Sequence, residues 1–218
     1  MKDIVRKLFF WPAILLWGVI GLVFLFMSKK TRRKLVSMSY PYKFYFRPIT
    51  TRVISVYNKM ESEVQKLIDK YPLLEIGCGN GNFLKTINNN GKCIGIDLYV
   101  NKSNENDNLL FIKCDGGGIP FKDETFGIVF AQYSLHHIEH INSTIKETFR
   151  VLKKGGKMIV IEDAPINFFG RFYADLNVSW LRIKKKWGKL FLNNGFSQFE
   201  CKTFKFLTGD KYLFEVVK

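Results

Sequence analysis

Three glycines at alternating positions form the segment of this sequence that is best suited to bind a ligand. Gly77, Gly79 and Gly81 lie between the apolar run 73–76 and a predicted helix over residues 83–89. Glycine lets a chain bend sharply, and a ligand can then approach the main-chain N–H groups at the start of the helix. The spacing therefore predicts a turn that binds a small ligand at the end of a strand.

Two aspartates follow later apolar runs. Asp97 ends the run Gly95-Ile96-Asp97, where a carboxylate can accept hydrogen bonds from both hydroxyls of a ribose. Asp115 ends the next run and is placed to accept from an adenine amino group. A nucleoside-containing ligand is the leading interpretation. A dinucleotide is disfavoured, because its fingerprint would need a glycine at Asn82.

At this point the chain resembles the class I S-adenosylmethionine-dependent methyltransferases, in particular the small-molecule branch with the ubiquinone and menaquinone biosynthesis enzymes. The resemblance runs from about Val53 to Val217. Its motifs, in order, are LLEIGCGNGNF, GIDLY, CDGGGIPFKDETFGIVF and ETFRVLKKGGKMIVIED. It implies a seven-stranded sheet whose last strand is antiparallel, and S-adenosyl-L-methionine as the cofactor.

The resemblance also assigns residues to this cofactor. Glu75 and the glycines flank its methionine part, Asp97 and Leu98 hold the ribose, and Asp115 and Gly116 border the adenine. The complete set is Glu75, Gly77, Cys78, Gly79, Gly81, Asp97, Leu98, Asp115, Gly116 and Gln132. The chain departs from the family at Gly127, where many members carry Asp, and at the triple glycine 116–118.

Histidines follow the fourth apolar run. His136, Glu139 and His140 spell the inverted zinc-protease motif. That interpretation would need a further acidic ligand and a large protease fold, so no metal is predicted. Two interpretations remain open for His136 and His137, which are the candidate catalytic residues. Either they line the acceptor pocket, or one of them deprotonates an acceptor hydroxyl.

Short apolar runs alternate with helical stretches through the rest of the chain. The predicted strands are 73–76, 93–96, 109–112, 128–131, 157–161, 199–206 and 212–217. The predicted helices are 53–68, 83–89, 143–152 and one within 167–193, and a turn is expected at Lys153–Gly156. Near-continuous apolar strands between helices indicate the doubly wound α/β class, with a Rossmann-like sheet covered on both sides.

Residues 8–27 contain no charged side chain, which predicts one transmembrane helix before the globular part. Basic residues flank this segment on both sides, more of them on its C-terminal side, so the positive-inside rule places the catalytic domain in the cytoplasm. A cleaved signal peptide would have a shorter apolar region. The expected organisation is an anchor over 1–34, a juxtamembrane linker over 35–52 and a methyltransferase domain over 53–218.

The charge pattern bears on partners. The sequence has 34 Lys and Arg against 19 Asp and Glu, a net charge of +15. The aromatic and basic stretch Tyr40–Arg47 suits bilayer headgroups, although it also suits a loop packed on the domain. A basic helix face near Trp180–Lys189 could touch anionic lipid or simply face solvent. The four cysteines show no zinc-site spacing.

The sequence thus predicts a single-pass membrane protein that methylates a small, lipophilic acceptor such as a quinone precursor or a lipid. Nucleic acid is a disfavoured partner, because no added RNA-binding domain is evident, and the oligomeric state is undetermined. Two rivals remain: the same fold acting on RNA or protein, and a membrane-tethered cofactor-binding protein without turnover. A measurement of cofactor affinity is the test between the second rival and the enzyme, and Gly77, Gly79, Asp97 and Asp115 predict that the chain binds the cofactor.

Overall fold

The computed structural model describes residues 51–87, 91–100, 105–165, 182–205 and 210–218. The predicted anchor at 8–27 and the stretch 40–47 lie outside the described residues. Within the described ranges, no helix combines the length and the apolar character that crossing a bilayer requires. The division into anchor, linker and domain therefore stays a prediction.

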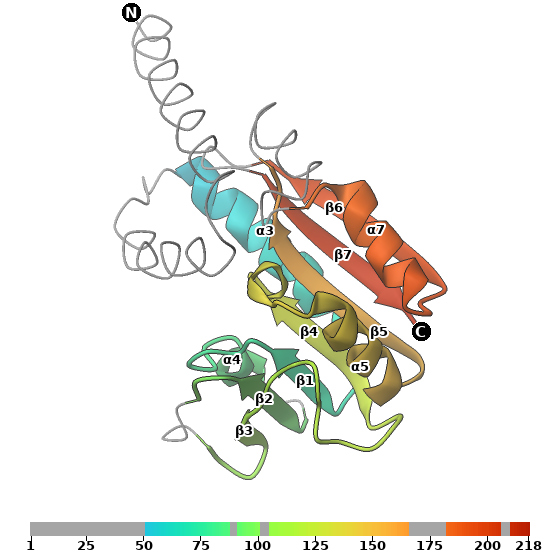
Figure 1. The fold of residues 1–218 in the computed structure, drawn as a ribbon. Helices are drawn as coiled ribbons and strands as arrows, with labels where there is room; N and C mark the ends of the chain where they lie inside the picture. The colour runs from blue at the N-terminus through green and yellow to red at the C-terminus, as the bar shows by residue number, and fades with distance from the viewer. Residues whose placement is uncertain (1–50, 88–90, 101–104, 166–181, 206–209) are drawn as a thin grey trace, which may run out of the picture.

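A seven-stranded sheet forms the centre of the molecule (Figure 1). The strands are β1 Leu73–Ile76, β2 Cys93–Asp97, β3 Leu109–Lys113, β4 Phe126–Gln132, β5 Leu152–Asp163, β6 Gln198–Phe204 and β7 Lys211–Val217. Their order across the sheet is β3-β2-β1-β4-β5-β7-β6. Strands β1 to β5 pair in parallel, and β7 is antiparallel to both β5 and β6. The doubly wound sheet and its antiparallel last strand are confirmed.

Helices cover both faces of this sheet. The described helices are α3 Thr51–Leu67, α4 Leu84–Ile87, α5 Ile141–Val151, α7 Lys184–Asn193 and the 3₁₀ helix η4 Leu135–His137. On one face, Met60 and Val64 of α3 and Leu84 of α4 are buried in one apolar cluster. On the other face, Ile145 of α5 and Trp187 of α7 are buried in a second cluster. Each large side chain of this kind contributes about 1.5–3 kcal/mol when fully buried.

The topology creates one edge where a ligand can bind. From β1 the chain moves outward to β2 and β3, and then returns to β4 on the other side of β1 (Figure 1). Ligands of open α/β sheets bind outside the carboxyl ends of the strands at such a reversal. The segments that follow β1, β2, β3, β4 and β5 all begin at this edge.

The turn predicted at Lys153–Gly156 is wrong as a boundary between helix and strand. Strand β5 already begins at Leu152, which pairs with Phe126, and the next pairing joins Lys157 to Ile128. Residues 153–156 are therefore an irregular excursion within β5. Gly155 has a φ of 66°, which places it in the left-handed region. The sequence did not indicate a strand here, because Lys153 and Lys154 are exposed although Leu152 and Gly156 are buried.

Gly127, the departure from the family pattern, has a packing explanation. A Cβ atom at this position would lie 2.7 Å from the Cβ atom of Lys70, a distance that real side chains do not reach. The ammonium group of Lys70 donates to the carbonyl of Gly155 at 2.8 Å. Gly127 is close to the amino end of β4, away from the ligand edge. The substitution thus affects local packing and leaves the predicted site unchanged.

Candidate functional site

The glycine turn is fixed between two neighbouring strands. The N–H of Gly77 donates to the carbonyl of Ile96 at the end of β2, over 2.8 Å. The hydroxyl of Ser134, which follows β4, donates to the carbonyl of Ile76 at 2.7 Å. A Cβ atom on Gly77 would lie 2.3 Å from that of Ser134, and Gly77 has a φ of 72°. Glycine is therefore required here, and it brings the segment after β4 against the turn.

Asp97 binds the main chain of the same turn. Its Oδ2 accepts a hydrogen bond from the N–H of Gly79 at 2.9 Å, and its Oδ1 accepts from the N–H of Tyr99 at 3.0 Å. Gly79 has a φ of 53°, and a Cβ atom there would meet no other atom within 4 Å. The open space beside Gly79 is a cradle in which a ligand can reach the main chain. Asp97 therefore shapes this cradle in addition to any contact with a ligand.

Glu75 is a buried acid with an unsatisfied oxygen. Only 4% of its surface is exposed, and its Oε2 has no hydrogen-bond partner among the described residues. Burial, and then the neighbouring charge of Asp97, raise the pKa of Glu75 well above its usual range. A positively charged ligand group at this oxygen would satisfy both the oxygen and the buried charge. S-adenosyl-L-methionine, which carries an ammonium and a sulfonium group, fits that requirement.

The remaining predicted cofactor residues lie around this cradle in different environments. Cys78 is buried, and burial raises the pKa of its thiol to about 12, so it packs as a neutral side chain. Leu98 is 52% exposed directly after Asp97, where an apolar surface is available to a ligand. Asp115 is exposed, and its Oδ1 accepts from the N–H of Gly117 at 2.9 Å. Gln132 is the last residue of β4.

Gly116 is half-buried beside α5. A Cβ atom at this position would lie 2.9 Å from the Cγ2 atom of Thr144. The close approach explains why the chain carries glycine here. It places the loop after β3 against the start of α5, at the same edge of the sheet as the glycine turn.

His136 forms a buried pair with Glu162, the residue before the last in β5. Its Nδ1 contacts Oε2 of Glu162, and their side chains are 5% and 1% exposed. The other oxygen of Glu162 accepts from the N–H groups of Leu135, at 2.9 Å, and of His136, at 3.3 Å. The carboxylate therefore fixes both the ring and the main chain of η4. In the neutral ring the proton lies on Nδ1, and Nε2 carries the lone pair that can accept a proton.

The other two histidines have different surroundings. His137 is exposed, and its ring centroid lies 4.0 Å from that of His136. His140 caps the start of α5, whereas His136 lies in η4, so the two do not share one helix as the zinc motif requires. The part of the chain that the structure describes contains no cluster of three metal-ligating side chains.

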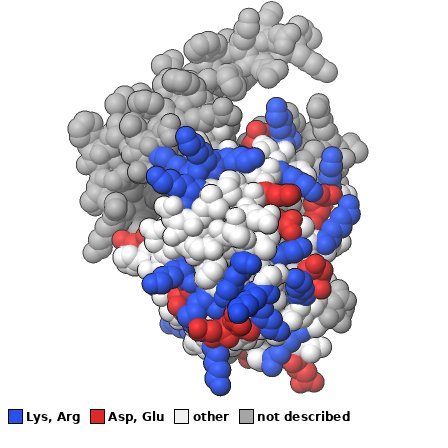
Figure 2. All heavy atoms as spheres, turned by 90° about the vertical axis from the view of Figure 1, so that its right-hand side faces the viewer, with Lys and Arg blue, Asp and Glu red and all other residues white. Residues whose placement is uncertain are grey.

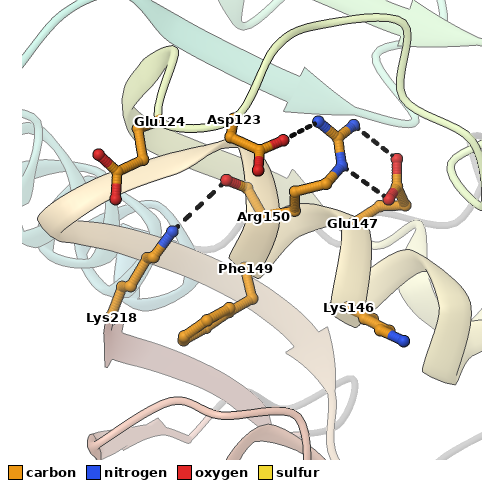
Figure 3. Close-up of a pocket in the computed structure, with 7 residues that line it drawn as sticks. All are labelled: Asp123, Glu124, Lys146, Glu147, Phe149, Arg150 and Lys218. Carbon is orange, nitrogen blue, oxygen red and sulfur yellow. Dashed lines mark hydrogen bonds and ion pairs between the residues drawn. The ribbon is translucent and has the colours of Figure 1, made fainter.

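A hollow of about 440 Å³ lies elsewhere, near the end of α5 (Figure 3). Its central cation, Arg150, is already paired with Asp123 at 2.8 Å and with Glu147 at 2.7 Å. Lys218 donates to the carbonyls of Leu152 and Arg150 (Figure 3). These residues bind the loop before β4 to the end of α5, at the amino ends of the strands. The hollow therefore has a structural role and lies far from the glycine turn.

A sequence model of a known family covers the central part of this site. The family is described as a methyltransferase domain, and its model matches residues 74–160. The matched residues make up less than half of the chain. The match includes the glycine turn, Asp97, Asp115 and the segment after β4. It ends just before Glu162, so the partner of His136 lies outside the matched residues.

Curated proteins that are similar to this chain have methyltransferase names. The chain is 34% identical over 121 residues to sterol 4-C-methyltransferase strm-1 of Caenorhabditis elegans, which covers 50% of the chain and 36% of that protein. It is 29% identical over 103 residues to demethylmenaquinone methyltransferase of Lactococcus lactis, which covers 41% of each. The chain thus spans less than half the length of these two relatives.

Solved structures share the fold. Phosphoethanolamine N-methyltransferase 2 of Haemonchus contortus superposes with a TM-score of 0.60 at 15% identity, covering 74% of this chain and 52% of that one. The YcgJ protein of Bacillus subtilis superposes with a TM-score of 0.57 at 15% identity, covering 74% and 98%. At these identities the likeness concerns the fold alone.

Two residues of this edge were missed by the sequence reasoning. Glu162 directly follows the apolar residues 158–161 of β5. This position was the available sequence signal, because an acid near the end of a buried strand requires a partner. Arg182 lies two residues before the lysines of α7, and no sequence signal separated it from them. The pairing of Glu162 with His136 joins segments far apart in the chain, whereas Arg182 contacts Trp187 at the start of the next helix.

Proposed function

We propose that the protein is an S-adenosyl-L-methionine-dependent methyltransferase that acts on a small, lipophilic acceptor at a membrane surface. The single observation that carries the proposal is the cradle at Gly79, bordered by Asp97 and by the unsatisfied carboxyl of Glu75. The match to a methyltransferase domain supports it. So do the names of relatives, which include sterol and demethylmenaquinone methyltransferases.

In this proposal the chain supplies alignment and proton transfer. Glu75, the glycine turn and Asp97 hold S-adenosyl-L-methionine, with Leu98, Asp115, Gly116 and Gln132 beside it. When bound, this cofactor supplies a methyl group already activated by its sulfonium. His136 accepts the proton of an acceptor hydroxyl at Nε2, because Glu162 holds the proton of the neutral ring on Nδ1. His137 lines the approach to His136.

The membrane part of the proposal rests on the sequence before the domain. The uncharged segment 8–27 is long enough to span a bilayer, and the basic residues after it favour a cytoplasmic domain. The basic stretch 40–47 and the exposed lysines of α7 suit anionic headgroups. An anchored enzyme meets a lipid acceptor at a high local concentration in two dimensions.

Replacing Asp97 by alanine should weaken S-adenosyl-L-methionine binding by at least about tenfold. The substitution removes charge-assisted hydrogen bonds to a ribose, each about 1.5–3 kcal/mol, and frees the N–H of Gly79. Calorimetric titration of the purified chain measures the change. Asp107→Ala, at an exposed acid, is the control. Equal affinities in the two variants would remove Asp97 from the site.

Deleting residues 1–28 should leave cofactor affinity within about twofold and reduce turnover of a bilayer-embedded acceptor by at least about tenfold. The shortened chain retains every described residue of the site but loses its predicted anchor. Methyl transfer into liposomes prepared from total lipid extract measures the effect. A shortened enzyme that methylates a water-soluble metabolite at full rate, and ignores the lipid, would refute the lipophilic acceptor.

A second candidate function is methylation of RNA. The specific observation in its favour is the excess of lysine and arginine in the C-terminal part of the chain. Adding RNA as a parallel substrate in the same assay distinguishes the two functions. Cofactor binding without transfer to any of these substrates would instead identify a tethered binding protein.

A further inference from the structure

Arg182 is a half-buried cation with one unsatisfied donor atom. Its Nη1 atom is buried and has no hydrogen-bond partner among the described residues. The guanidinium lies over the ring of Trp187, 5.0 Å from the ring centroid, and Trp187 is completely buried. The ring therefore holds the guanidinium in place without satisfying its donors. The indole Nε1 of Trp187 is a second buried donor without a partner.

Glu162, the acid whose charge acts on Arg182, does not satisfy this donor. Glu162 acts on Arg182 through its charge, but both of its oxygens already accept hydrogen bonds from η4 and from His136. Burial lowers the pKa of Arg182 despite that charge. A half-buried guanidinium with an unused donor is costly unless an anion pairs with it.

The position of Arg182 is at the ligand edge of the sheet. Glu162, which senses its charge, is near the carboxyl end of β5, and α7 begins two residues after Arg182. The first turn of α7 contains no acid and has no side-chain cap, so its positive end also favours an anion. Lys184 and Lys185 are exposed there, and Lys and Arg side chains are abundant on this side of the molecule (Figure 2).

We propose that Arg182 and Trp187 bind an oxyanion, a carboxylate or a phosphate, carried by the methyl acceptor. The inference rests on the proposed function and narrows its substrate class to amphiphilic acids. The acceptor places its hydroxyl at His136 and its acidic group at Arg182. This acidic group lies near the carboxyl end of β5, on the side away from strands β2 and β3, which border the cofactor. A neutral lipid would leave the guanidinium unpaired, and so would bind less tightly.

The test compares small aromatic probes that differ in charge. Benzoate, phenyl phosphate and the neutral benzamide are titrated against the full-length protein saturated with S-adenosylhomocysteine, and dissociation constants are measured by ligand-detected NMR. We expect benzoate or phenyl phosphate to bind at least about tenfold tighter than benzamide. The stronger of the two distinguishes a carboxylate from a phosphate acceptor.

Variants identify the residue responsible. Arg182→Gln should abolish the preference for the anionic probe, Arg182→Lys should keep part of it, and Lys146→Gln, on the exposed face of α5, should keep all of it. Equal binding of charged and neutral probes by the wild-type protein would overturn the proposal, and so would a full preference in Arg182→Gln. If Arg182→Gln does not fold, the proposal is tested by two measurements. These are the preference of the wild-type protein for the anionic probes over benzamide and the reduced preference of Arg182→Lys. Loss of S-adenosylhomocysteine binding by the wild type would instead refute the proposed function.

Discussion

Replacing Glu162 by glutamine should lower kcat by about 100-fold or more, while S-adenosyl-L-methionine affinity stays within about twofold. The glutamine oxygen can still accept from the N–H groups of Leu135 and His136, which keeps η4 in place. The carboxylate of Glu162 accepts a hydrogen bond from Nδ1–H of His136. The amide nitrogen of glutamine instead donates a hydrogen bond to Nδ1. The proton of the neutral ring then moves to Nε2, and His136 can no longer take a proton from the acceptor.

Steady-state kinetics and calorimetry on the same preparations measure these two effects. Glu200→Gln, at an exposed acid on β6, is the matched control and should behave as wild type. His136→Gln should be as slow as Glu162→Gln, and the double variant should be no slower than either, because the two residues act as one unit. A Glu162→Gln enzyme with wild-type kcat would show that His136 has only a structural role.

Replacing Gly79 by alanine should reduce S-adenosyl-L-methionine affinity by at least about 100-fold and stability by only about 1–2 kcal/mol. Gly79 lies in the left-handed region, and nothing in the described structure approaches within 4 Å of the position of the new methyl group. The stability cost is therefore backbone strain alone. The loss of affinity has another origin, because the methyl group fills the space in which the cofactor reaches the main chain.

Gly155 provides the matched control for this experiment. Its φ of 66° and the open space around it reproduce the strain of Gly79, but it lies in the excursion of β5, away from the ligand edge. Gly155→Ala should lose similar stability in urea unfolding and bind S-adenosyl-L-methionine as the wild type does. If Gly79→Ala also bound the cofactor with wild-type affinity, the cradle would be assigned to the wrong place.

Local patterns allowed most of the fold to be predicted. Apolar runs with turn residues between them located the buried strands, and glycine spacing located the turn after β1, because both features depend on neighbours in sequence. The start of β5 was misplaced, because Lys153, Lys154 and Gly155 are exposed, unlike the buried apolar residues 158–161 that marked the strand. The helix starting at Lys184 was predicted only as part of the longer range 167–193.

The site was predicted in part for the same reason. Asp97 and the glycines belong to short motifs, so their meeting at one edge follows from parallel strands. The pairing of His136 with Glu162 joins residues 26 positions apart and depends on the register between β4 and β5. The contact of Arg182 with Trp187 depends on where α7 docks. Neither pairing has a signature in sequence spacing.

We propose that this chain transfers a methyl group from S-adenosyl-L-methionine to a lipophilic acceptor. The most direct measurement is incubation of the purified full-length protein with cofactor carrying a labelled methyl group and, in parallel, a total lipid extract, a small-metabolite extract and RNA. We expect label in the lipid extract with the wild-type protein and its loss with Gly79→Ala. Label found in RNA or in a water-soluble metabolite, or in none of the three, would contradict it.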